Sequence, residues 1–206
     1  MGALGGRFIP KDIYPYSFKE YLAIKNVPHD AKTRLSTSSR ALFFTHYNRY
    51  FLWGGMPESM DKAVPREYLS STYQKIYISD IATRNKISNL PALRLMIKKM
   101  AETVGQSVSY NRISHILSSL GGKISVPTIQ SYISYAEDAW FLLRLRNIKG
   151  AISEKESVCK YYFIDNGFLN LFLLNGETAL LENMVALELF RRYGHDPEND
   201  TVYFYN

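Results

Sequence analysis

Residues 109–140 read SYNRISHILSSLGGKISVPTIQSYISYAEDAW, and they carry the most specific structural pattern in the chain. Its first half predicts a short helix over residues 110–120 that ends at Gly121 and Gly122, where a positive φ costs little. Its second half predicts another helix after Ser125, with Pro127 in the first turn, where the missing N–H is harmless. Two short helices joined by a glycine turn are typical of a helix-turn-helix.

The flanking segments extend this helix pair. An apolar helix is expected over residues 91–104, a strand over 140–147 and a second strand over 160–164, with the polar hairpin GAISEKES between the strands. Three helices followed by two strands is the order of a winged helix-turn-helix. We therefore expect a mostly helical α+β fold with a winged helix at residues 89–165.

The helix after Ser125 has two distinct faces. Its buried stripe is expected at the spacing i, i+3, i+4 and i+7, which falls on Ile129, Tyr132, Ile133 and Ala136. Glutamine can pair with adenine through two hydrogen bonds, and serine or threonine can bond to bases or phosphates. The candidate DNA contacts on the opposite face are therefore Thr128, Gln130, Ser131 and Ser134.

Positive charge is concentrated in the same region. Residues 91–150 hold eight Lys or Arg against three Asp or Glu, which is +5 of the chain's formal net charge of +6. Basic side chains on phosphates set the affinity of DNA binding. The basic candidates are Arg112, Lys123, Arg144, Arg146 and Lys149. The helix after Ser125 has no Lys or Arg of its own, so a partner-binding role for the winged helix stays open.

Residues 1–88 are expected to be largely helical. Ser17 and Glu20 have the spacing of a capping box, which predicts a helix start. A helix over about residues 40–53 ends at Gly54 and Gly55, and another covers residues 66–84. The first of these is expected to bury Leu42, Phe43, Tyr47, Tyr50 and Phe51. The second is expected to bury Leu69, Tyr73, Ile76, Tyr77 and Ile81.

Composition excludes several classes of protein. A single cysteine, Cys159, excludes an internal disulfide framework. The densest apolar run, residues 168–174, is far shorter than the roughly 18 residues of a membrane-spanning helix. The opening MGALGG has neither a signal-peptide nor a myristoylation pattern, so we expect a cytoplasmic protein without membrane contact. The four histidines show no metal-ligand spacing, and no metal site is expected.

The chain resembles a known family in four motifs that occur in order. They are YFLWGGMPE at residues 50–58, the helix pair at 110–140, KYYFIDNGF at 160–168 and LLENMVALEL at 180–189. They resemble the C-terminal half of bacterial and archaeal AAA+-type ATPases, a half that is a domain-of-unknown-function family. The resemblance implies the end of the P-loop ATPase domain plus a helical region at residues 1–88. It also implies an incomplete, α/β nuclease-like segment of PD-(D/E)xK type at residues 166–206.

The catalytic parts that this resemblance implies are incomplete here. The chain has no G-x-x-x-x-G-K-[ST] phosphate loop, so we expect no cofactor in it, while ATP and Mg²⁺ would belong to the full-length parent. Arg7 stands where similar ATPases place an arginine finger. The alternative is that Arg7 is a surface residue at the edge of a strand, which is expected over residues 7–9. Glu182 stands where the nuclease-like end would place a helix acid, and it would be vestigial without the Asp and E-x-K strand that complete such a metal site. Asp165 is expected to organise a turn before Gly167 through an Asx-type bond.

Three functions are open on the sequence alone. The first is a non-catalytic, truncated C-terminal fragment of an AAA+-type ATPase, whose winged helix binds duplex DNA. The second is a protein–protein interaction module through which ATPase subunits assemble as a homo-oligomer. The third is a metal-dependent nuclease domain, whose metal-binding strands are missing. We expect no enzymatic activity from this chain, and DNA as its partner.

Overall fold

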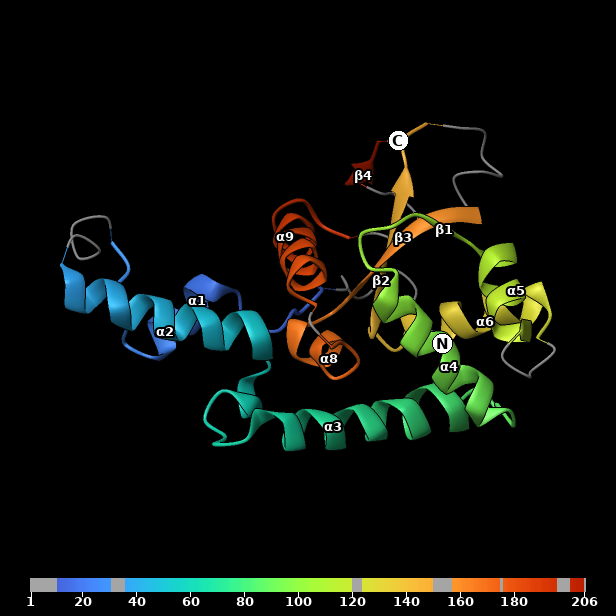
Figure 1. Cartoon of the computed structure of the whole chain (residues 1–206), viewed down its shortest axis with the longest axis horizontal. Helices are drawn as coiled ribbons and strands as arrows, with labels where there is room; N and C mark the ends of the chain where they lie inside the picture. Colours follow the sequence, from blue (N-terminus) through green and yellow to red (C-terminus); the bar gives the residue numbers. More distant parts are fainter. Residues whose placement is uncertain are drawn as a thin grey trace.

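The computed structural model describes residues 11–30, 36–119, 124–149, 157–174, 176–195 and 201–205. Arg7, Lys123 and the strand expected at residues 7–9 lie outside these ranges. Within them the chain is mostly helical, with one small mixed sheet (Figure 1). This confirms the α+β fold class.

The elements follow one another as helices first and strands later. The helical elements are α1 (Phe18–Ile24), α2 (Thr37–Trp53), the 3-10 turn η2 (Pro57–Ser59), α3 (Pro65–Lys75), the π-helix η3 (Ile76–Thr83), α4 (Leu90–Glu102), α5 (Tyr110–Ser119), α6 (Val126–Asp138), α8 (Asn166–Asn170) and α9 (Glu177–Tyr193). The strands are β1 (Val108–Ser109), β2 (Leu142–Asn147), β3 (Val158–Phe163) and β4 (Tyr203–Phe204). Their order in the sheet is β1-β3-β2-β4; β3 is antiparallel to β1 and β2, and β4 is parallel to β2.

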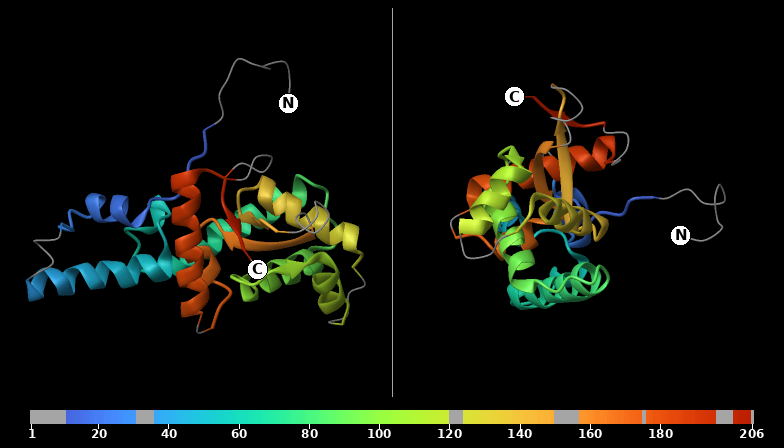
Figure 2. Two further views of the ribbon diagram at one scale, coloured as in Figure 1. Left: turned by 90° about the horizontal axis from the view of Figure 1, so that it is seen from above. Right: turned by 90° about the vertical axis from the view of Figure 1, so that its right-hand side faces the viewer.

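The molecule is elongated. Helices α1 and α2 project from one end, α8 and α9 lie in the middle, and α5 and α6 form the other end (Figure 1 and the left view of Figure 2). The sheet lies between α9 and the α5–α6 pair, while α3 and η3 run along one side beneath them. None of the described helices combines the length and the apolar composition that crossing a membrane requires.

Capping residues start the helices where the sequence predicts. The Oγ of Ser17 accepts a hydrogen bond from the N–H of Glu20 at 3.3 Å, and the N–H of Ser17 donates to Glu20 Oε2 at 2.8 Å. The expected capping box of α1 is therefore confirmed. Ser125 caps α6 in the same way, accepting from the N–H of Thr128, with Pro127 in the first turn.

The helix expected over residues 66–84 is present but changes type along its length. It is α-helical to Lys75 and π-helical from Ile76 to Thr83. Its expected stripe is buried at four positions and half-buried at Ile76; the buried four are Leu69, Tyr73, Tyr77 and Ile81. Hydrophobic spacing does not separate the two helix types here, because the same side chains face the core in both. π-Helical turns are rare and occur often at functional sites.

The predicted core face of α2 is largely wrong. Only Tyr50 is buried; Phe43, Tyr47 and Phe51 are half-buried, and Leu42 is 45% exposed. The reason is that the N-terminal half of α2 extends beyond the body of the molecule, where α1 is the described element that packs on it (Figure 1). The buried residues there form a small separate cluster of Tyr21, Leu22, Val27, Tyr50 and Met60.

The main hydrophobic core is continuous from Leu69 to Phe204. It includes the buried faces of α3, α4, α5, α6, β2, β3, α8 and α9. It therefore crosses both expected segment boundaries, after residues 88 and 165, and the division into three segments stays a prediction. Strand β4 comes from the segment expected to be nuclease-like, and it joins the sheet beside β2.

Three of the four motifs that carry the family resemblance, at residues 50–58, 160–168 and 180–189, meet at a buried polar cluster. We call this cluster the motif junction; it consists of Gly54, Gly55, Asp165, Asn166 and Asn183. Asp165 is 2% exposed; its Oδ1 accepts from the N–H of Gly167 at 2.8 Å, which confirms the expected Asx turn. Its Oδ2 accepts from the N–H of Gly55 at 2.7 Å. The Asn183 amide bonds both the N–H and the C=O of Phe163, as well as Asn166 Oδ1. The junction therefore ties α2, β3, α8 and α9 together.

Candidate nucleic-acid interface

The segment from α4 to β3 has the topology of a winged helix-turn-helix. Helix α4 leads to the short strand β1, then to α5, α6, β2 and β3. Strand β1 pairs with β3 through Val108 and Cys159, so three of the strands form the sheet typical of a wing. Sequence patterns missed β1 because two residues carry no alternation signal.

Buried aliphatic side chains fix the two helices of the motif against each other. Ile113 and Leu117 of α5, and Ile129 and Ile133 of α6, are completely buried. The Ser114 hydroxyl donates to the C=O of Ile124 at 2.6 Å and joins α5 to the start of α6. The predicted stripe of α6 is therefore confirmed, and the rotation of α6 about its axis is set.

That rotation presents the four predicted polar residues away from the core. Gln130, Ser131 and Ser134 are exposed, and Thr128 is half-buried. Ser131 donates to the C=O of Pro127 at 3.0 Å, and Thr128 lies 2.8 Å from the capping Ser125 (Oγ1 to Oγ). Across the described part of the chain, Gln130 and Ser134 form no hydrogen bond with other protein groups. Their amide and hydroxyl are available to a ligand.

Two of the predicted basic residues are exposed. Arg112 belongs to α5, and Lys149 follows β2 at the base of the wing. The Nζ of Lys149 lies 4.0 Å from the ring centroid of Tyr205, which orients the ammonium group. Arg146 is half-buried on β2. Lys123 lies between α5 and α6, outside the described ranges.

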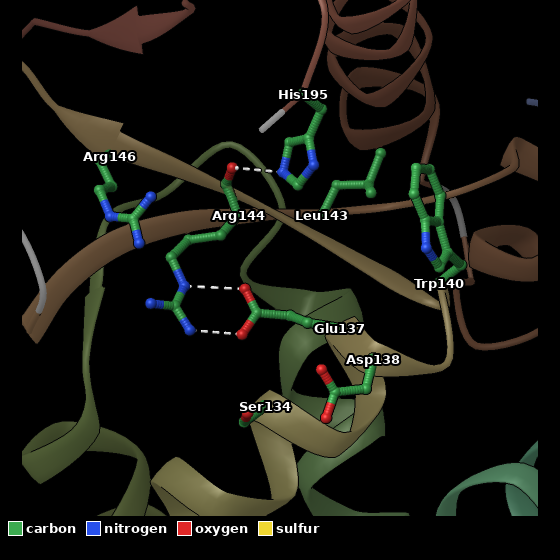
Figure 3. A pocket seen from close by; sticks show the side chains of 8 residues that line it. All are labelled: Ser134, Glu137, Asp138, Trp140, Leu143, Arg144, Arg146 and His195. Atoms are coloured by element: carbon green, nitrogen blue, oxygen red, sulfur yellow. Dashed lines mark hydrogen bonds and ion pairs between the residues drawn. The ribbon is translucent and has the colours of Figure 1, made fainter. Parts of the chain in front are cut away.

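Arg144, another of the predicted basic contacts, is paired within the fold. Its guanidinium forms a bidentate ion pair with Glu137 at the end of α6 (Figure 3) and lies 6.0 Å from the ring centroid of Tyr161. The side chains of the pair are only 17% and 19% exposed. Burial raises the pKa of Glu137, and the hydrogen bond and charge of Arg144 oppose that rise. Arg144 therefore pairs with a largely buried carboxylate, and its role as a DNA contact stays a prediction.

A pocket of about 300 Å³ lies where α6 ends and β2 begins (Figure 3). Its walls include Ser134 and Asp138 of α6, Arg146 of β2, and His195 after α9. His195 Nε2 lies 3.1 Å from the C=O of Arg144 and donates to it, since a carbonyl only accepts. Sequence patterns gave no signal for His195, because it lies 51 positions from Arg144 and belongs to no motif.

Trp140 forms one side of this pocket in an unusual backbone conformation. The N–H of Phe141 donates to the C=O of Ala136 at 2.9 Å, and that of Trp140 to the C=O of Glu137 at 2.8 Å, which is a Schellman helix end. Trp140 has φ 55°, at the position that glycine usually occupies and where other residues cost roughly 1 kcal/mol or more. Its ring lies edge-on to Tyr14, at 5.7 Å between centroids, and to His195, at 6.5 Å. The indole therefore links α6 to two distant parts of the chain.

Glu182, the expected nuclease-like acid, takes part in contacts within the fold. Its Oε1 accepts from the Tyr162 hydroxyl at 3.0 Å and lies 3.4 Å from Lys160 Nζ. Over the ranges that the structure describes, no group of three or more His, Cys, Asp or Glu side chains is arranged to hold a metal ion. Glu182 thus stabilises the packing of α9 on β3. Its identity as a vestigial nuclease acid stays a prediction.

Comparisons with known proteins add relatives without an assigned activity. The profile of a family described as a domain of unknown function (DUF8612) matches residues 44–179. An uncharacterized protein of Methanocaldococcus jannaschii is 29% identical over 201 residues, covering 96% of this chain and 45% of that protein. An uncharacterized protein of Haemophilus influenzae is 33% identical over 197 residues, covering 92% of this chain and 46% of that protein. The chain thus spans less than half the length of these curated relatives. No solved structure matches it.

Proposed function

The chain belongs to the family described as a domain of unknown function (DUF8612), and from this premise we propose that it binds duplex DNA through its winged helix. We further propose that it forms the C-terminal, non-catalytic part of a larger P-loop ATPase. The four ordered motifs support the second proposal. The length of the relatives also supports it, because more than half of each lies outside the matched region and leaves room for a nucleotide-binding domain.

The outward face of α6 is the observation that carries the DNA proposal. Gln130 and Ser134 are exposed on the helix that a helix-turn-helix inserts into the major groove. Their side chains match the edges of bases, since an amide pairs with adenine and a hydroxyl bonds to a base or a phosphate. The opposite side of α6 is completely buried, so DNA would meet only this polar face.

Phosphate contacts in this proposal come from the neighbours of α6. Arg112 lies on α5, which contacts α6, and Lys149 follows β2, which also contacts α6. Basic groups at such positions neutralise the DNA backbone and fix the orientation of the protein. Because α6 carries no cation, the base contacts of Gln130 and Ser134 would add selectivity to an affinity set mainly by these neighbours.

Fluorescence anisotropy with a labelled duplex tests the proposal. The double variant Arg112→Ala/Lys149→Ala is expected to bind at least about tenfold more weakly than the unaltered protein at moderate salt. The matched control is Lys19→Ala/Lys75→Ala, which removes two exposed cations from α1 and α3 and is expected to bind normally. Equal affinities of the two double variants would exclude DNA binding through the winged helix.

A second candidate function, self-association, is favoured by one feature of α9. Leu181, Val185 and Leu189 recur every four residues and are 48%, 51% and 39% exposed. The first turn of α9 is acidic and its last turn basic, so two copies packed antiparallel would place opposite charges together. Such a pairing would assemble the subunits of the parent protein.

Light scattering tests this second candidate. A dimer that dissociates in Leu181→Ser/Val185→Ser, and persists in the control Val64→Ser/Ile78→Ser, would support it. The control residues are also exposed and apolar but lie away from α9. A protein that stays monomeric at all concentrations would exclude self-association by this chain.

A further inference from the structure

A basic groove lies between α3 and α4, formed by none of the elements that present the DNA-binding face. It consists of two adjoining hollows, of about 410 Å³ and about 200 Å³, that share Arg94 and Lys98 of α4 as a common wall. Tyr77 of η3 lines the larger hollow, and Arg66 and Tyr73 of α3 line the smaller one. We call these residues, with Phe172 at the far edge, the α3–α4 groove.

The charge of the groove is entirely positive. Arg66, Arg94 and Lys98 line it, and among the described residues no Asp or Glu lines either hollow. Arg94 and Lys98 are four positions apart, so they share one face of α4, where like charges repel and destabilise the helix. Arg66 donates to the C=O of Leu171 at 3.4 Å, and the Arg94 guanidinium lies 5.4 Å from the ring centroid of Tyr77. These contacts orient the cations without supplying a counter-ion.

The Tyr73 hydroxyl is a second, independent feature of the same groove. Tyr73 is 6% exposed, and its hydroxyl is buried without a hydrogen-bond partner among the described residues. A buried hydroxyl of this kind destabilises a fold unless a ligand satisfies it. The neighbouring Tyr77 differs, since its hydroxyl donates to the C=O of Leu90 at 2.6 Å. Burial raises the pKa of Tyr73 to about 12; the neighbouring Tyr77 adds to that rise and the charge of Arg94 opposes it. Tyr73 and Arg94 line the same hollow.

We propose that the α3–α4 groove binds a small organic phosphate, with the phosphate held by Arg94, Lys98 and the Tyr73 hydroxyl. The cations supply charge, and the hydroxyl donates one hydrogen bond to a phosphate oxygen. The apolar body of the ligand would lie against Phe172, which forms an edge-on pair with Tyr73 at 5.1 Å between ring centroids. Because Tyr73 lines the smaller hollow, a small phosphate would fit beside its hydroxyl, whereas the rigid backbone of a duplex would remain at the surface.

Titration with phenyl phosphate, followed by amide chemical shifts at low ionic strength, tests this proposal. Shifts are expected at the groove residues. Arg94→Gln/Lys98→Gln is expected to weaken binding by more than about tenfold, because hydrogen bonds to charged groups are the strong ones. The matched control Lys19→Gln/Lys75→Gln removes the same charge elsewhere and is expected to bind like the unaltered protein.

Tyr73→Phe separates a binding role from a structural one. Without phenyl phosphate this variant is expected to melt at a higher temperature, because it removes an unsatisfied buried hydroxyl. With phenyl phosphate it is expected to bind about tenfold more weakly. Absence of groove shifts in the unaltered protein, or equal binding by the groove and control double variants, would overturn the proposal. So would an equal loss of duplex DNA affinity in Arg94→Gln/Lys98→Gln, since that would make the groove a DNA contact.

Discussion

The carboxylate of Asp165 and the backbone N–H of Gly55 are hydrogen-bonded at 2.7 Å, although 110 positions separate them in the chain. The other carboxylate oxygen accepts from Gly167, so both oxygens of Asp165 are used. This bond joins the motif at residues 50–58 to the motif at residues 160–168. It holds the C-terminal end of α2 against α8. Glycine is needed at position 54 because the carboxylate leaves no space for a side chain, and at position 55 because the backbone C=O of Tyr16 lies too close.

Gly54→Ala is expected to destabilise the fold by about 3 kcal/mol or more. Gly54 has φ 70°, and an added Cβ would overlap the buried carboxylate of Asp165. Gly105→Ala is the matched control: Gly105 also has a positive φ, 82°, but its Cβ would meet the flexible, half-exposed Glu182 side chain. Urea denaturation should therefore show a clearly larger loss for Gly54→Ala. Equal losses would mean that backbone conformation, and not the junction, sets the cost.

Acidification is expected to strengthen the contribution of Asp165 to stability. Burial raises its pKa from the ordinary 3.8 to about 6, against the opposing effect of the two backbone donors. The folded state then holds this proton more tightly than the unfolded state, so the free energy of unfolding rises by about 3 kcal/mol as the pH falls from 7 toward 4. Chemical denaturation across this range, compared with Asp165→Asn, measures the effect. The same pH dependence in both proteins would contradict it.

Asn183→Ala is expected to cost about 3 kcal/mol or more. The Asn183 side chain is completely buried, and its loss leaves the N–H and C=O of Phe163 and the amide of Asn166 with unsatisfied bonds. Asn170→Ala is the control, because Asn170 makes a single bond, to the C=O of Leu52, in a more exposed position. Thermal or urea denaturation should show a loss of about 1 kcal/mol for the control. A similar loss for both would show that the junction is not stabilising.

Arg144→Met is expected to destabilise the protein by about 3 kcal/mol, because it leaves Glu137 charged and buried without its partner. Glu137→Met/Arg144→Met removes both charges and is expected to lose less. The pKa of Glu137 should rise further in the single variant, so that variant should recover stability as the pH falls. Denaturation at two pH values measures both effects. A single variant no less stable than the double variant would contradict the role assigned to this ion pair.

The salt dependence of DNA binding should report each phosphate contact. Replacing Arg112 with Ala is expected to lower the slope of log K against log salt by about one, equally for all duplex sequences. Gln130→Ala should leave the slope unchanged and reduce discrimination between duplexes. Anisotropy titrations at several salt concentrations distinguish the two. An unchanged slope for Arg112→Ala would remove Arg112 from the interface.

The sequence predicts those parts of the fold that have local signals. Serine caps and glycine stops mark the ends of α1, α2 and α6, and the i, i+3, i+4 spacing gives the buried face of α6. The same logic fails for α2, because its aromatic spacing is that of a core helix while half of it has little to pack against. The π-helical form of η3 and the short strand β1 leave no separate pattern.

The sequence predicts the position of a candidate site residue only where a local pattern, such as helix periodicity, determines it. The outward position of Gln130 follows from helix periodicity. The ion pair between Arg144 and Glu137 does not follow from periodicity, because it depends on how β2 crosses the end of α6. The same holds for Asp165, whose Asx turn is local and predictable, whereas its bond to Gly55 depends on the tertiary fold. Tyr73 looked like an ordinary core residue, since a missing hydrogen-bond partner is visible only in three dimensions.

Trp140 makes the direction of α6 depend on parts of the chain that are remote from it. The tryptophan holds the turn after α6 in a left-handed conformation, and Tyr14 and His195 hold the tryptophan. A displacement at either contact, for example by a neighbouring domain that pulls on the segment before α1, would be transmitted to the tilt of α6. In the larger P-loop ATPase proposed above, these two ring contacts would carry nucleotide-driven motion to α6.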